Sequence, residues 1–185
     1  MWQIETKEKK VYLTFDDGPT PDVTPFVLDV LKRFRLKATF FCIGDNVAKH
    51  PTLYQSVIDQ GHAVGNHTFD HLNGFKTTLD TYVQNTTKAS ELIDSKLFRP
   101  PYGRIRKSQI GALGLDYSIV MWSIISGDFD ETLNKERAMN KMMKGTEPGS
   151  IIVFHDSLKS LPNLEVLLPK YCEFLAKNNY TSCGL

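Results

Sequence analysis

Two adjacent carboxylates, Asp16 and Asp17, follow a short apolar segment near the start of the chain. Neighbouring carboxylates raise each other's pKa and resist joint ionisation unless a cation lies beside them. Asp-Asp-Gly-Pro is also common turn chemistry, so the pair alone does not distinguish a turn from a functional site. If the pair is functional, the sequence predicts a metal ion or a basic side chain close to it.

Two histidines, His67 and His71, are four residues apart. On a helical turn their rings would lie on one face and bind one ion, although an isolated pair of this spacing is equally typical of a surface or capping pair. With Asp17 they form a set of two imidazoles and one carboxylate, as in catalytic metal sites that keep positions open for water and substrate. These three residues predict one divalent ion, with zinc preferred and cobalt or nickel as substitutes.

Four further residues have side chains suited to acid and base chemistry. If Asp17 binds the metal, the carboxylate of Asp16 is left as a general base toward water, whose pKa a metal lowers to about 7. Arg99 ends an expected strand and supplies the cation that keeps Asp16 ionised. His155 also ends an apolar segment and is the expected general acid, which Asp128 would orient while raising its pKa. The alternatives are a surface arginine and a histidine satisfied within the core.

Length and composition limit the classes of protein to which the chain can belong. Its 185 residues suit one domain over 1–185, with a real core and a surface pocket. Lys and Arg total 22 against 21 for Asp and Glu, a balance that argues against nucleic acid as a partner. The three cysteines lack the spacing of a zinc knuckle or redox pair and are expected to be core thiols. We expect a monomer.

The sequence also bears on the compartment. No stretch reaches the roughly 18 apolar residues of a membrane span, and the first residues lack the basic and apolar layout of a signal peptide. We therefore expect a cytoplasmic protein, or an extracytoplasmic one if a leader has been removed.

Segments rich in β-branched and aromatic residues alternate with amphipathic segments along the whole chain. Expected strands cover 11–15, 38–43, 62–65, 97–99, 117–122, 150–154 and 180–183, and expected helices cover 24–34, 52–59, 78–94, 107–113, 134–144 and 163–177. This alternation predicts an α/β protein with a parallel sheet, either open or closed into a barrel. The candidate residues follow five different strands and can converge only if the strand ends share a rim. We therefore expect a distorted (β/α) barrel with about seven parallel strands.

Four separated motifs, in this order, resemble those of the polysaccharide deacetylases of carbohydrate esterase family four, the NodB-homology domain. They are Thr14-Phe15-Asp16-Asp17-Gly18, His67-Thr68-Phe69-Asp70-His71, Arg99-Pro100-Pro101-Tyr102-Gly103 and Phe154-His155. The resemblance covers nearly the whole chain and implies a distorted (β/α) barrel. It also implies Asp16 as the base, Asp17 and both histidines as metal ligands, and His155 as the acid.

The resemblance implies a substrate-binding groove as well. Arg99 would pair with the base, and the backbone amide of Tyr102 would help to hold an oxyanion. The groove walls are expected from Pro101, Tyr102, Gly103, Trp122 and Phe129. Family members commonly have Asp-Trp where this chain has Asp128-Phe129, and Ile125 stands at an often acidic position. Phe129 can supply an apolar wall but cannot donate an indole hydrogen bond, so substrate preference is the property most affected.

By resemblance, the expected reaction is hydrolysis of a linear amide, the N-acetyl group of an N-acetylglucosamine-containing glycan such as a chitin oligomer or peptidoglycan, with release of acetate. O-acetyl esterase action on xylan is an alternative for the same site. A non-haem iron oxygenase also uses two histidines and a carboxylate, but does not need a second aspartate, an arginine and a distal histidine. An inactive glycan-binding module would be expected to lack Asp16 or His155.

Overall fold

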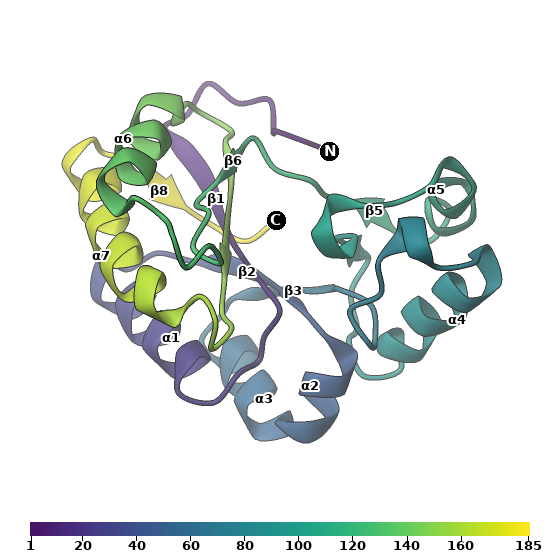
Figure 1. Ribbon diagram of the computed structural model, residues 1–185. Helices are drawn as coiled ribbons and strands as arrows, with labels where there is room; N and C mark the ends of the chain where they lie inside the picture. The colour runs from purple at the N-terminus through teal and green to yellow at the C-terminus, as the bar shows by residue number, and fades with distance from the viewer.

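Parallel strands form the centre of the computed structural model, which describes all residues 1–185 (Figure 1). They are β1 (Lys10–Asp16), β2 (Ala38–Cys42), β3 (Ala63–Asn66), β4 (Leu97–Phe98), β5 (Ser118–Ile119), β6 (Ile124–Ile125), β7 (Ile151–His155) and β8 (Thr181–Ser182). Seven lie in the order β5-β4-β3-β2-β1-β7-β6, and β8 pairs with the beginning of β1. These seven strands curl into a half-barrel, which confirms the predicted distorted (β/α) barrel.

Seven α-helices surround the sheet in Figure 1. They are α1 (Val23–Phe34), α2 (Gly44–Lys49), α3 (Pro51–Asp59), α4 (Leu79–Ser90), α5 (Lys107–Leu113), α6 (Lys135–Gly145) and α7 (Leu161–Lys177), with 3-10 turns at Gly74–Lys76 and Pro101–Gly103. The side chains of Thr78 and Asn134 cap α4 and α6 by accepting hydrogen bonds from backbone amides of the first turn, which fixes where these helices begin. None of the helices combines the length and the hydrophobicity needed to cross a membrane.

The side chains of β1 point alternately toward the helices and into the half-barrel, as the two-residue period of a strand requires. Leu13 and Phe15 belong to the main hydrophobic core between the sheet and the helices. Thr14 and Asp16 instead contact the guanidinium of Arg99. The apolar residues of β1 therefore anchor the strand while Asp16 is directed into the half-barrel.

The predicted strand at 117–122 is shorter in the structure. Only β5 forms within it, because its neighbour β4 ends at Phe98. The backbone amide of Val120 still donates to the Phe98 carbonyl (2.8 Å), but that of Met121 donates to the carbonyl of Met1 (2.6 Å). The pairing partner of this segment thus changes from β4 to the start of the chain.

Two elements, β6 and α2, are absent from the sequence prediction. Each is too short to show a strand or helix period. As a consequence Asp128 follows β6, and not the segment 117–122 as predicted.

The first residues of the chain lie along the sheet. Met1 pairs with Met121 just after β5, and the amide of Ile4 donates to the carbonyl of Gly149, just before β7 (3.0 Å). In Figure 1 the end marked N accordingly lies beside the segment that follows β5. Position 2 is therefore held by backbone hydrogen bonds on both sides.

Candidate active site

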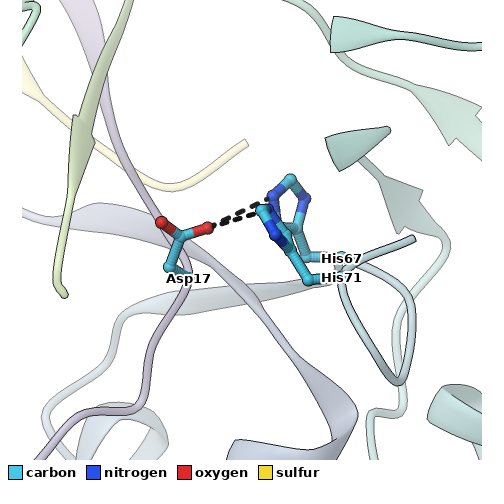
Figure 2. Close-up of side chains that lie close together, drawn as sticks. All are labelled: Asp17, His67 and His71. Carbon is cyan, nitrogen blue, oxygen red and sulfur yellow. Dashed lines mark ion pairs between the residues drawn. The ribbon is translucent and has the colours of Figure 1, made fainter. Parts of the chain in front are cut away.

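Asp17, His67 and His71 come together at the carboxyl ends of β1 and β3 (Figure 2). Oδ1 of Asp17 lies 3.1 Å from Nε2 of His71 and 3.6 Å from Nε2 of His67. One ligand atom from each residue lies within 4.8 Å of the others. The three residues predicted as metal ligands thus present two nitrogens and one oxygen to a common point.

The sequence predicted that the two histidines lie on a helical turn, and this prediction is wrong. The segment 67–73 is a loop in which Thr68 (φ 63°) and His71 (φ 54°) adopt left-handed conformations. Hydrogen bonds from the Thr68 amide to Oδ1 of Asn66 (2.8 Å) and from the Leu72 amide to Oγ1 of Thr68 (3.1 Å) hold this loop. Its curvature, and not a helical period, brings both rings toward Asp17.

The protonation of His67 suits a metal ligand. Its Nδ1 lies 2.7 Å from the backbone oxygen of Arg99. A carbonyl oxygen only accepts, so Nδ1 carries the proton and Nε2 directs its lone pair toward Asp17. Burial lowers the pKa of His67 to about 4, which keeps the ring neutral at physiological pH.

Asp17 has an acceptor that the protein leaves unused. Its Oδ1 is buried and has no hydrogen-bond donor, although Nε2 of His71 lies 3.1 Å away. Burial acts to raise the pKa of Asp17, but the contact with His71 and the neighbouring histidines outweigh it and lower the pKa to about 2. A buried carboxylate oxygen without a donor, facing two imidazole nitrogens, fits a bound divalent cation.

The turn that carries Asp17 is fixed from several sides. Asp17 has a left-handed conformation (φ 84°), and its carbonyl accepts a hydrogen bond from Nδ2 of Asn46 (2.7 Å). The next amide, that of Gly18, donates to Oδ1 of Asp156 (3.0 Å). A Cβ on Gly18 would lie 2.0 Å from Oδ2 of Asp156, so only glycine fits there.

Asp156 is a site residue that the sequence prediction missed. It is fully buried, and its Oδ2 also accepts a 2.6 Å hydrogen bond from Oγ1 of Thr24. Burial raises the pKa of Asp156 to about 8. The available signal was an acidic residue directly after His155, where an apolar strand enters a loop.

Asp16 and Arg99 form a buried ion pair. Nη1 of Arg99 lies 2.7 Å from Oδ1 of Asp16, and the two side chains are 0% and 5% exposed. The guanidinium also donates to Oγ1 of Thr14 (2.7 Å) and to the backbone oxygens of Met121 (2.9 Å) and Val120 (3.3 Å). The sequence therefore placed the cation correctly beside the aspartate pair.

His155 and Asp128 form a second pair. Nδ1 of His155 lies 2.7 Å from Oδ1 of Asp128, whose Oδ2 accepts a hydrogen bond from the His155 amide (2.8 Å). Burial lowers the pKa of His155, but the hydrogen bond and the charge of Asp128 outweigh it and raise the pKa to about 9. The imidazole is therefore cationic at neutral pH, with Nε2 bearing a transferable proton. The Phe129 ring packs edge-on against it, with ring centroids 5.2 Å apart.

These groups open into one cavity of about 600 Å³, a size within the usual range of small-molecule sites. Its lining includes Asp16, Asp17, His67, His71, Tyr102, Gly103, Trp122, Ile125, Phe129 and His155. Pro101, predicted as a groove residue, is buried and does not line the cavity. Four further lining residues were not predicted: Asn73, Arg104, Ser157 and Lys159. They lie in loops whose course the sequence pattern does not indicate.

The wall after β4 has a distinct shape. Tyr102 (φ 61°) and Gly103 (φ 65°) are both left-handed, and a Cβ on Gly103 would lie 2.6 Å from the Trp122 ring. The Tyr102 ring packs against His71 with ring centroids 4.6 Å apart. This turn therefore places an exposed aromatic ring directly beside the cluster of Asp17, His67 and His71.

Comparison with known proteins gives similarity along the whole chain. The family model described as polysaccharide deacetylase matches residues 3–117. Two peptidoglycan-N-acetylglucosamine deacetylases of Bacillus cereus are 36% identical over 155 residues and 34% identical over 186 residues, which is 80% and 97% of this chain. The chain spans 56% of the length of the first of these relatives and 87% of the second.

A solved structure agrees with this similarity. The crystal structure of a peptidoglycan N-acetylglucosamine deacetylase superposes with a TM-score of 0.87 at 30% identity, covering 100% of this chain and 89% of that one. The similarity thus includes the fold as well as the sequence.

Proposed function

Because the chain belongs to the polysaccharide deacetylase family, we propose that it hydrolyses the N-acetyl group of an N-acetylglucosamine-containing glycan and releases acetate. The observation that carries the proposal is that Asp16, paired with the buried Arg99, His155, paired with Asp128, and the Asp17-His67-His71 set all meet at one cavity. Peptidoglycan fragments and chitin oligomers are the two substrates to compare.

Asp17, His67 and His71 would hold a divalent cation, with zinc preferred and cobalt or nickel as substitutes. Such an ion supplies Lewis acidity toward the acetyl carbonyl and lowers the pKa of water. The remaining chemistry belongs to side chains of this protein.

Asp16 acts as the general base. It removes a proton from the water that attacks the acetyl carbonyl carbon, while Arg99 holds its carboxylate in place through the 2.7 Å ion pair. The negative charge that develops on the carbonyl oxygen receives a hydrogen bond from the backbone amide of Tyr102.

His155 acts as the general acid. Its raised pKa keeps a proton on Nε2 at neutral pH, because Asp128 holds the opposite ring nitrogen. As the C–N bond breaks, this proton passes to the departing nitrogen, which leaves as the free amine. The acyl carbon keeps the oxygen of water and departs as acetate.

An acetate-release assay tests the proposal. The panel contains chito-oligosaccharides, peptidoglycan fragments and acetylated xylan, each with protein stripped of metal and with the same protein after zinc is restored. We expect zinc-dependent acetate release from an N-acetylated glycan, with and without oxygen. Release from xylan alone would indicate an O-acetyl esterase, a requirement for oxygen would indicate an oxygenase, and glycan binding without acetate would indicate an inactive module.

A further inference from the structure

Few aromatic side chains are exposed, and two of them line the cavity. The chain has 2 Trp, 7 Tyr and 11 Phe residues, but only four of them are exposed: Trp2, Phe75, Tyr102 and Phe129. Tyr102 and Phe129 line the cavity, and the amide of Phe75 is hydrogen-bonded to the cavity residue Asn73 (3.0 Å). Two of the four exposed aromatic rings therefore line the cavity, and a third belongs to the segment next to it.

Trp2 adjoins the cavity through its contact with Trp122. It is 61% exposed, and its ring centroid lies 6.5 Å from that of Trp122 at an interplanar angle of 58°. Trp122 lines the cavity and lies over the guanidinium of Arg99 at 5.8 Å. Trp2 thus continues the aromatic surface outward from the catalytic ion pair, beyond the cavity itself.

The position of Trp2 is defined by the backbone. The carbonyl of Met1 accepts a 2.6 Å hydrogen bond from Met121, and Gln3 forms an antiparallel bridge with Ser150. Packing does not account for the choice of tryptophan, because most of the side chain remains in water. Trp2 is not an isolated surface residue, because it adjoins the cavity-lining Trp122, and a continuous apolar surface that borders a cavity is typical of a ligand contact.

From these observations we infer that Trp2 and Trp122 form an outer sugar-binding subsite, which holds a ring of the glycan next to the one whose acetyl group is hydrolysed. The inference rests on the proposed function and adds a preference for chain length. One face of a pyranose ring presents C–H groups, which pack on the electron-rich face of an indole. Trp122 lines the cavity and Trp2 lies beside it but outside the lining, so a sugar ring that extends from the cavity past Trp122 would meet Trp2.

Kinetics on chito-oligosaccharides of two to six sugars test the subsite. Trp2→Ala is expected to lower kcat/KM for the pentamer and hexamer by about three- to tenfold, the loss expected for one aromatic stacking contact. The loss should appear in KM and be smaller for the dimer, while Trp2→Phe should restore most of it. Leu115→Ala is the control, because Leu115 is 89% exposed and does not line the cavity.

Fluorescence gives a readout that does not require turnover. Trp2 and Trp122 are the only tryptophans of the chain, so chitopentaose added to a zinc-loaded Asp16→Asn protein should change the emission. The change should be smaller, and the affinity lower, when Trp2→Phe or Trp2→Ala is added.

The results separate this inference from the proposed function. Absence of acetate release by wild-type protein from both chito-oligosaccharides and peptidoglycan fragments would contradict the function. Activity that falls equally for all lengths in Trp2→Ala, or not at all, would overturn the subsite alone. A wild-type dimer in solution that Trp2→Ala converts to a monomer would also overturn it, because Trp2 would then be an interface residue.

Discussion

Asp16 and His155 are direct partners in the parallel register of β1 and β7. The amide of Asp156 donates to the carbonyl of Asp16 (3.0 Å), which continues the same ladder past His155. The proposed base and acid therefore stand on adjacent strands of one sheet, and the spacing between them is set by backbone pairing. This arrangement allows each group to be altered separately, as the following experiments do.

Asp128→Asn should weaken the acid. In the folded protein the pKa of His155 is about 9, above its ordinary 6.5, so the protonated pair stabilises the fold below pH 6.5 and this contribution is lost as pH rises through 9. Activity should fall over the same alkaline range. Without the carboxylate of Asp128, the alkaline fall in activity should occur at lower pH, and kcat should fall by roughly 100-fold. A pH–rate profile from pH 5 to 10 measures both effects.

Asp130→Asn is the matched control for this experiment, because Asp130 is an exposed carboxylate two residues further along the chain. Its pH–rate profile should match that of the wild-type protein. An Asp128→Asn profile with an unmoved alkaline limb would contradict the assignment of His155 as the acid.

Asp16→Asn should abolish turnover while leaving metal bound. An amide can still accept the hydrogen bond from Arg99 but cannot take a proton, so activity should fall by roughly 100- to 10,000-fold. Elemental analysis should find the same zinc content as in wild-type protein, whereas Asp17→Asn should lose both zinc and activity. Substantial turnover in Asp16→Asn would refute its role as the base.

Arg99→Met should destabilise the fold. The substitution leaves the buried carboxylate of Asp16 without its partner, which costs about 3–5 kcal/mol of unfolding free energy. Adding Asp16→Asn should recover part of the loss, because a neutral amide is less costly to bury. Urea unfolding at pH 7 measures the single and the double variant. Arg33→Met, which removes an exposed pair with Asp29, should change stability by no more than about 0.5 kcal/mol.

Gly18→Ala should distort the turn that carries Asp17. The new Cβ would lie 2.0 Å from Oδ2 of Asp156, and overpacking of this kind costs about 1–3 kcal/mol. Zinc affinity should fall as well, because the turn aims the Asp17 carboxylate. Gly111→Ala in α5 is the comparison, since a Cβ there contacts nothing within 4 Å. This substitution should raise the free energy of unfolding by about 0.5–1 kcal/mol, because alanine favours a helix more than glycine does. Unfolding and zinc titration that leave Gly18→Ala indistinguishable from wild type would contradict this account.

The grouping of Asp16, Asp17 and His155 could be predicted from the sequence. Each follows an apolar strand, and parallel strands deliver their carboxyl ends to one edge of a sheet. Arg99 could be placed beside Asp16 for the same reason, and because an aspartate pair needs a cation. Strand order and ion pairing are thus encoded in local patterns that a reader of the sequence can recognise.

The loop from His67 to His71 could not be predicted in this way. Its left-handed residues are stabilised by tertiary hydrogen bonds, including those from the Phe69 and Asp70 amides to Oδ1 of Asn85 (2.9 and 3.0 Å). Asp156 was missed because its partners, Gly18 and Thr24, lie more than 130 positions away. Contacts between distant segments leave no periodic signal.

Arg99 has a structural role that is separate from its contact with Asp16. Its guanidinium joins β1 to the segment after β5, so it holds two parts of the half-barrel together as well as contacting the aspartate. A lineage that abandons hydrolysis can exchange Asp16 for a neutral acceptor and keep its architecture, whereas losing Arg99 removes that link. An arginine at this position therefore reports on the architecture, while the proposed base and acid, Asp16 and His155, are the positions to inspect when active members of the family are sorted from inactive ones.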